Sequence, residues 1–110
     1  MSRAAHRAWA FGATGALINL ITVPGAHKFE IVDWSCSGSA NAGTGYLLMN
    51  DAVASATFFL DQMVLAAGIW VDHHEWGCGV VEAGNTIQVL WIGGAGTGGV
   101  HQLSYIDVLL

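Results

Sequence analysis

Short apolar runs separated by glycine-rich breaks recur from residue 16 to the end of the chain. The runs are rich in β-branched and aromatic residues, which favour strands over helices. Runs of this length and spacing are typical of a β-sandwich or barrel. We therefore predict an all-β, single-domain antiparallel β-sandwich, jelly-roll-like, with seven or eight strands. The predicted strands cover residues 16–23, 29–36, 46–49, 57–65, two runs between 68 and 94, and 100–110.

Residues 68–94 show the strand pattern most clearly. Successive side chains of a strand point to opposite faces, so one face of the first run is formed by Trp70, Asp72, His74 and Trp76. The second run carries bulky side chains on both faces, as in a strand that is buried on both faces of its sheet. The connection is too short and too rich in glycine for a crossover helix. The two strands are therefore neighbours in a meander or the two sides of a sandwich corner.

Residues 51–68 also nearly fit a helical period, which makes a helix the competing interpretation there. The β-branched and aromatic content of the stretch, and the turn signals at both of its ends, favour a strand over residues 57–65. Asp61 and Gln62 are polar residues in the middle of that strand and are the point at which it would divide into two.

The composition indicates a protein that associates with other chains. Hydrophobic residues make up 54% of the sequence and charged residues only 10%, against a usual charged share of about 25%. A small domain with so little charge is expected to have part of its exterior covered by another protein. Five tryptophans are also more than one small core commonly holds. We expect Trp9 or Trp76 to lie in an interface, where tryptophan is enriched.

The charges are unevenly placed along the chain. Arg3, Arg7 and Lys28 are its three basic residues, and the eight acidic residues all follow Phe29. We divide the chain into an N-terminal arm, residues 1–14, and a β-sandwich domain, residues 15–110. The acidic domain disfavours nucleic-acid binding. The basic arm either docks on an acidic neighbour, including another copy of the chain, or is a frayed terminus with two incidental arginines.

Targeting and redox signals are weak. The apolar run that follows the two arginines is interrupted by Asn19 and Thr22 and lacks a good cleavage site, so it fits a signal peptide poorly. No run reaches the roughly 18 apolar residues of a membrane span, and we expect no membrane association. Cys36 and Cys78 are too few for a disulfide scaffold, and buried free thiols are the favoured alternative to a disulfide between them. We therefore expect assembly inside a host cytoplasm.

Two motifs resemble functional sites. Residues 94–99 match the GxGxxG pattern, but a dinucleotide site needs a helix after this loop and here a strand is expected. The sequence Asp72-His73-His74-Glu75 is the only polar cluster with ligand chemistry, and its alternation places two side chains on each face. A zinc site would need further ligands, for which the candidates are His27, His101 or a cysteine. We therefore predict no metal and no cofactor, and favour a polar rim or a subunit contact. If these histidines meet a symmetry mate or the acidic domain, we expect assembly to depend on pH.

The sequence offers no recognisable catalytic arrangement. None of its possible nucleophiles lies in a GxSxG elbow or a similar setting, and no spacing singles out a pair of carboxylates. We predict that the protein is not an enzyme. The nucleophiles considered are Ser35, Ser37, Ser39, Ser55, Ser104, Cys36 and Cys78.

A resemblance to a known class rests on three features. They are the glycine- and alanine-rich chain of this length, Trp76 before the turn at residues 83–85, and the following Ile-x-Val strand of Ile87 and Val89. Over residues 29–110 the chain resembles small β-sandwich structural proteins of tailed-phage particles, which include head decoration (cement) proteins and fibre- or spike-associated proteins. The resemblance implies symmetric, often trimeric, association. The basic arm departs from that pattern.

Two functional hypotheses follow. The first is a virion structural protein, a bacteriophage capsid decoration or cement protein that forms a homo-oligomer, favoured as a trimer, and binds a major capsid protein or another virion protein. Its expected interface residues are Arg3, Arg7, Trp9, Phe11, His73, His74 and Trp76. The alternative is a carbohydrate- or ligand-binding module, fibre- or lectin-like, in which an aromatic side chain stacks on the ligand. Its expected site residues are Trp70, Asp72, His74 and Trp76.

Overall fold

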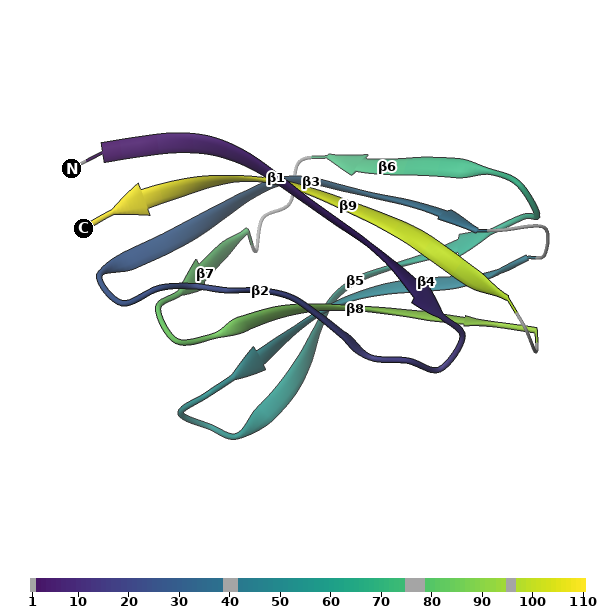
Figure 1. The fold of residues 1–110 in the computed structure, drawn as a ribbon, viewed down its shortest axis with the longest axis horizontal. Helices are drawn as coiled ribbons and strands as arrows, with labels where there is room; N and C mark the ends of the chain where they lie inside the picture. The colour runs from purple at the N-terminus through teal and green to yellow at the C-terminus, as the bar shows by residue number, and fades with distance from the viewer. Residues whose placement is uncertain (1, 39–41, 75–78, 95–96) are drawn as a thin grey trace.

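The computed structural model describes residues 2–38, 42–74, 79–94 and 97–110 (Figure 1). These residues form nine strands and no helix, so none of them belongs to a helix that could cross a membrane. The strands are β1 (Ser2–Ala13), β2 (Ile18–Thr22), β3 (His27–Gly38), β4 (Gly43–Asp51), β5 (Ala56–Leu65), β6 (Trp70–His74), β7 (Val80–Glu82), β8 (Thr86–Gly93) and β9 (Gly98–Leu109).

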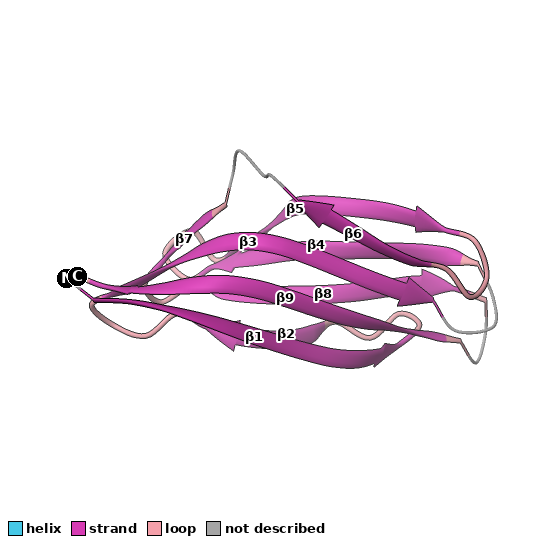
Figure 2. Ribbon diagram, turned by 90° about the horizontal axis from the view of Figure 1, so that it is seen from above, coloured by secondary structure: helices cyan, strands magenta, loops and turns pink. Residues whose placement is uncertain are grey.

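The strands form two antiparallel sheets that pack as the two layers of a sandwich (Figures 1 and 2). The first sheet has the order β1-β9-β3-β6, and β7 also pairs with β3, on the side where β6 lies. The second sheet has the order β2-β8-β4-β5. If β6 and β7 are counted as two pieces of one strand, this is the strand order of a jelly roll. The predicted all-β sandwich is confirmed.

The N-terminal segment forms the edge strand of the first sheet. Residues 2–13 of the expected arm form β1, which pairs with β9 along its whole length, from Ser2 opposite Leu109 to Ala13 opposite Gly98. The two chain ends consequently lie side by side (Figure 1). Whether the segment also reaches a neighbouring subunit stays a prediction.

The two runs between residues 68 and 94 lie in different sheets. β6 pairs with β3 in the first sheet and β8 pairs with β2 and β4 in the second, so the sandwich corner is right and the meander is wrong. The described part of the connection between them contains the short strand β7. The turn at residues 83–85 is present, and Gly84 adopts φ of 87° there, a conformation that favours glycine.

Residues 56–65 form one continuous strand, so the helical alternative is wrong. Leu47 pairs with Asp61 and Leu48 with Phe59, which leaves Leu60 as an extra residue. A bulge of this kind bends a strand without ending it. It explains why the polar pair near Asp61 does not divide β5 in two.

The core between the sheets is built around two tryptophans. Trp34 on β3 and Trp91 on β8 are fully buried. A buried aromatic side chain hides roughly 150 to 250 Å², which at about 25 cal/mol/Å² is about 4 to 6 kcal/mol before the entropy cost. The other members of the core are mostly aliphatic and come from both sheets. They include Val23, Phe29, Ile31, Leu47, Leu65, Val81, Ile87, Val89 and Leu103.

Glycines on three strands make room for the Trp91 indole. A β-carbon added at Gly43 would lie 2.4 Å from Trp91 Cζ2, one at Gly93 would lie 2.8 Å from Nε1, and one at Gly99 would lie 2.7 Å from Cε3. No real β-carbon approaches an aromatic ring so closely. Part of the glycine content, which in the sequence indicated only turns, is therefore a packing requirement of one tryptophan.

Candidate functional site

The expected interface residues of the N-terminal segment lie in alternate positions along β1, which has β9 as its only partner strand among the described residues. Residues two apart in a strand share a face, so Arg3, Arg7, Trp9 and Phe11 form a row on one side of the first sheet. Trp9 is 70% exposed and Phe11 is 59% exposed. Apolar side chains exposed to this degree on an edge strand are available for contact with another chain.

Both arginines of the row are held on the sheet. Arg3 forms an ion pair with Glu30 on β3. The Gln102 side chain lies 3.1 Å from Arg7 Nε and 3.3 Å from one terminal guanidinium nitrogen, so its carbonyl oxygen accepts from Arg7. These contacts orient the arginines over the surface of the first sheet.

Trp70, expected to stack on a ligand, lies at the opposite edge of the same sheet. The backbone pairing runs from Phe11 through Val100 and Ser37 to Trp70. Residues paired directly across strands share a face. Phe11 and Trp70, one from each predicted set of residues, therefore lie on the same face of the first sheet. The strands that carry them are separated by three strand spacings of about 4.8 Å. Phe11 and Trp70 do not form one compact cluster.

The remaining predicted residues are only partly covered by the structure. Asp72, His73 and His74 pair through their backbones with Ser35, Trp34 and Asp33, and their side chains lie outside the described part. Trp76 and Cys78 lie outside the described residues entirely. Their proposed roles in an interface or a ligand site stay predictions.

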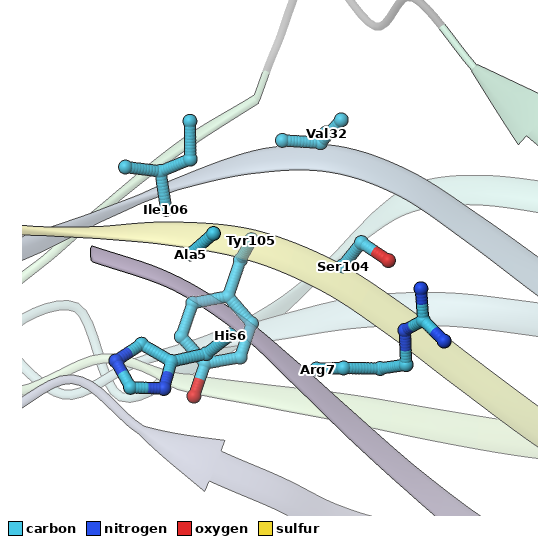
Figure 3. A pocket seen from close by; sticks show the side chains of 7 residues that line it. All are labelled: Ala5, His6, Arg7, Val32, Ser104, Tyr105 and Ile106. Carbon is cyan, nitrogen blue, oxygen red and sulfur yellow. The ribbon is translucent and has the colours of Figure 1, made fainter. Parts of the chain in front are cut away.

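A shallow groove crosses the outer face of the first sheet between these two sets. It consists of two hollows, of about 360 Å³ and about 160 Å³, which share Arg7 and Ser104. The larger hollow has an apolar surface of Ala5, Val32 and Ile106, and Figure 3 shows the stacked rings of His6 and Tyr105 on the opposite side of the strands. The smaller hollow is mainly polar. It is lined by Arg7, Asp33, Ser35, Trp70, Gln102 and Ser104.

Sequence reasoning found Trp70 and Arg7 but not the residues between them. Asp33, Ser35, Gln102 and Ser104 come from β3 and β9, the two central strands of the first sheet. Two of these four residues, Gln102 and Ser104, alternate with buried residues along β9, and this alternation places them on the outer face of the sheet. Nothing in the sequence shows which strand lies next to β9, so the groove itself was not predictable.

A second exposed surface lies on the outer side of the second sheet, along β5. Phe59 is 69% exposed and Val64 is 79% exposed, and both belong to this edge strand. Val64 pairs with Thr44, which pairs with the exposed Ile92 on β8. Tyr46 contacts Phe59 with ring centroids 5.4 Å apart. The apolar side chains therefore extend from β5 across β4 to β8.

His101 and Cys36 are backbone partners in the core rather than surface ligands. His101 is fully buried, its Nδ1 accepts from Trp34 Nε1 at 3.3 Å, and burial lowers its pKa to about 4. Burial raises the pKa of the Cys36 thiol to about 12, which keeps it protonated and a poor nucleophile. Cys36 is buried and free, as expected for one of the two thiols.

The sequence candidates for additional metal ligands do not converge. His27 Nδ1 lies 2.6 Å from an Asp107 carboxylate oxygen at one end of the sandwich, and His101 lies in the core. Among the described residues, no group of three His, Cys, Asp or Glu side chains can hold a metal ion. The GxGxxG segment leads into β9, which begins at Gly98, so a strand follows it as predicted. The helix N-terminus that a dinucleotide site requires is not formed there.

These features define a jelly-roll sandwich with two shallow hollows, one apolar and one polar, on one sheet and exposed apolar side chains on the other. No protein-family model matches the sequence, and no curated protein matches it. Among solved structures, the fold is similar to a protein of Bacillus endospore appendages, described as a novel family of disulfide-linked pili. The TM-score is 0.53 and the identity 10%, over 99% of this chain and 89% of that one.

Two further structures resemble the chain more distantly. One is a chain of the cyanophage Pam1 capsid asymmetric unit, with a TM-score of 0.49 and 10% identity over 94% of this chain and 85% of that one. The other is the virus-like particle of the extra small virus of the giant freshwater prawn Macrobrachium rosenbergii, with a TM-score of 0.40 and 10% identity over 97% and 80%. At these identities the similarity to the appendage protein extends to the fold alone.

Proposed function

We propose that the chain is a non-enzymatic structural protein that works by associating with copies of itself in a virus particle. Its specific role is then that of a decoration, or cement, protein that stabilises a bacteriophage capsid. The observation that carries the proposal is the apolar surface along β5, where Phe59 is 69% and Val64 is 79% exposed. Large apolar side chains exposed to this degree on one face of a small domain mark a contact site for another protein.

The proposed mechanism is a clamp in which exposed apolar side chains are buried against neighbouring subunits. Burial of the exposed part of Phe59 removes about 140 Å² from water, taking two thirds of a typical aromatic side-chain area. At about 25 cal/mol/Å² this contributes about 3.5 kcal/mol to each contact before entropy costs. A few such contacts per subunit stabilise a shell without a covalent link.

A second contact is proposed along β1. Its outward row combines Arg3 and Arg7 with the exposed rings of Trp9 and Phe11. The rest of the chain is acidic, with a net charge of −5 overall. The basic strand therefore complements the acidic surface of another copy or of a major capsid protein. The β1 row and the β5 surface are two different contact surfaces, and head-to-tail contact between two different surfaces is what builds a closed ring such as a trimer.

The similar fold of the endospore appendage protein is compatible with a subunit role, since pili are polymers. That appendage is described as disulfide-linked. In this chain Cys36 is fully buried, so the proposed association does not use that thiol. Burial of Cys36 also supports the proposal that the protein is not an enzyme, because a buried thiol is not available as a nucleophile.

The test is the solution mass, measured by light scattering after size exclusion at about pH 7, with a repeat at about pH 5.5. We expect a trimer or larger species, and we expect Phe59→Lys and Val64→Lys to convert it to a monomer that keeps its β-sheet circular dichroism. Val53→Lys is the matched control, because Val53 is 97% exposed but lies in the β4–β5 turn, away from the sheet face.

Two results would contradict the assembly proposal. One is a wild-type chain that stays monomeric at all concentrations and does not bind capsids. The other is an oligomer whose mass is unchanged by both lysine substitutions. Loss of the oligomer at the lower pH would implicate the His73-His74 pair that the sequence singled out.

A further inference from the structure

We propose that the free edge of β1 binds the β1 strand of a second copy, so that the first sheets of two subunits join into one continuous sheet. β1 lies at the edge of the first sheet and pairs with β9 on one side (Figures 1 and 2). Among the described residues no strand pairs with its other side, so the backbone N–H and C=O groups that point away from β9 can bind another strand. This contact rests on the self-association proposed above, and it names both the partner of β1 and the way that partner is bound.

β1 differs from the other edge strands of the described structure because it lacks the features that protect an exposed edge. Protected edges are very short, or carry a bulge, a proline or an inward-pointing charge. β6 and β7 have only five and three residues, β2 has five residues and a register shift, and β5 has the bulge at Leu60. β1 has 12 residues, contains no proline, and pairs with β9 without a register shift. It is therefore the edge best suited to accept another strand.

The two arginines of β1 do not guard its free edge. Arg3 reaches across the sheet to Glu30 on β3, and Arg7 donates to Gln102 on β9. Both side chains are therefore drawn toward the middle of the sheet and away from the free edge. A charge that projected along the edge would lose its water when a second strand paired there, at a cost in free energy. β1 avoids that cost because its charges are held elsewhere.

A second copy fits this edge because β1 is complementary to itself in an antiparallel register centred on Ala8. In that register the pairing runs from Arg3 opposite the partner's Ala13 to Ala8 opposite the partner's Ala8. Directly opposite residues share a face, so Arg7 lies beside the partner's Trp9 on the outer face. A guanidinium beside an exposed indole is a favourable cation–π arrangement. A register centred on Arg7 would instead place the two Arg7 side chains opposite each other.

The inner face of β1 also permits this pairing. Every pair of opposite residues on that face includes at least one alanine or glycine, so two strands can approach to about 4.8 Å without a clash between side chains. On the outer face the ring of Phe11 likewise lies opposite a small residue, Ala5. The inner-face pairs are Ala8 with Ala8, Ala10 with His6, and Gly12 with Ala4.

Pairing through the edge leaves the outward row of β1 available for another partner, because the edge and the row are different surfaces of the strand. The contact is twofold symmetric and joins subunits in pairs, whereas the β5 surface lies on the other sheet. In the joined sheet the rows of both copies lie side by side. They form one basic and aromatic surface, twice as large as that of a single subunit, which complements an acidic neighbour.

The test is disulfide cross-linking through single cysteines on β1, in a Cys78→Ser background. Ala8→Cys places the thiols of two copies directly opposite each other, within the reach of a disulfide. Ala10→Cys is the matched control on the same face, because its two copies would lie about 14 Å apart along the strands. We expect mild oxidation to give at least tenfold more covalent dimer with Ala8→Cys than with Ala10→Cys. Adding Phe59→Lys to Ala8→Cys should leave the cross-link unchanged, since Phe59 lies on the other sheet.

Hydrogen exchange of the unsubstituted chain gives a second measurement that needs no variant. The β1 amides that point away from β9 should exchange at least tenfold more slowly in concentrated protein than in dilute protein. The other half of the β1 amides, which bond to β9, should exchange at the same rate in both.

Three results would overturn the edge pairing. They are a covalent dimer that forms equally at both cysteine positions, an Ala8→Cys protein that stays uncross-linked, and β1 amides whose exchange does not depend on concentration. Any of these in a chain that light scattering shows to be oligomeric would remove the β1 contact alone. A chain that is monomeric throughout would remove the edge pairing and the proposed self-association together.

Discussion

The buried histidine of the core makes the stability of this protein depend on pH. His101 is fully buried and neutral, and its pKa lies at about 4 instead of the ordinary 6.5 because burial disfavours the charged ring. In the unfolded chain the ring titrates near its ordinary value. The unfolded state therefore binds more protons than the folded state between these two pKa values, and stability falls as the pH falls through that window.

The size of the effect follows from the two pKa values. With 6.5 unfolded and about 4 folded, the loss relative to high pH is about 1.4 kcal/mol at pH 5.5 and about 2.5 kcal/mol at pH 4.5, with a limit near 3.4 kcal/mol below the folded pKa. A small domain has about 5 to 15 kcal/mol of stability in total. Protonation of one side chain can therefore remove a large share of it.

The assay is urea unfolding, followed by circular dichroism, at intervals between about pH 7.5 and pH 4.5. The comparison protein is His101→Gln, which keeps a polar group beside Trp34 but does not titrate. Carboxylates and the other histidines are the same in both proteins, so their contributions cancel in the difference. We expect the wild-type free energy of unfolding to fall more steeply, by about 2.5 kcal/mol over this range. Parallel pH profiles for the two proteins would refute the reasoning.

Two further substitutions test the packing of the core. Gly43→Ala should destabilise the fold by about 1 to 3 kcal/mol, since the new β-carbon would lie 2.4 Å from Trp91, whereas Gly25→Ala meets no atom within 4 Å and should be nearly neutral in the same urea titration. In a Cys78→Ser variant, a thiol reagent should leave Cys36 unmodified until urea unfolds the chain, because Cys36 is buried and its pKa is raised to about 12. Rapid native labelling of Cys36 would contradict that burial.

The strands were predictable because their signal is local. Short runs rich in β-branched and aromatic residues, bounded by turn residues, identified β3, β5, β8 and β9 closely, since these signals depend only on the run itself. The expected arm was harder to read. Its alternating row of Arg3, Arg7, Trp9 and Phe11 has polar and apolar residues on one face, and small residues at Ala8 and Ala10 on the other, so no apolar stripe marks it as a strand.

The groove was not predictable because it depends on which strands are neighbours. Ser35 and Gln102 are far apart in the sequence and meet only through the pairing of β3 with β9. Strand order is set by the packing of the whole sandwich, and one sequence carries no direct record of it. The sequence identified chemistry at the two edges of the sheet, in Arg7 and Trp70, and the fold supplied the polar residues between them.

The glycines around Trp91 have a consequence for how this sequence can diverge. Gly43, Gly93 and Gly99 are excluded from carrying a β-carbon by the same indole. A lineage that replaced the tryptophan with a smaller residue would release all three positions at once, and a lineage that first gained a side chain at any of them would be selected to lose the tryptophan. The four positions are therefore expected to change together in distant homologues, as one coupled unit that joins strands of both sheets.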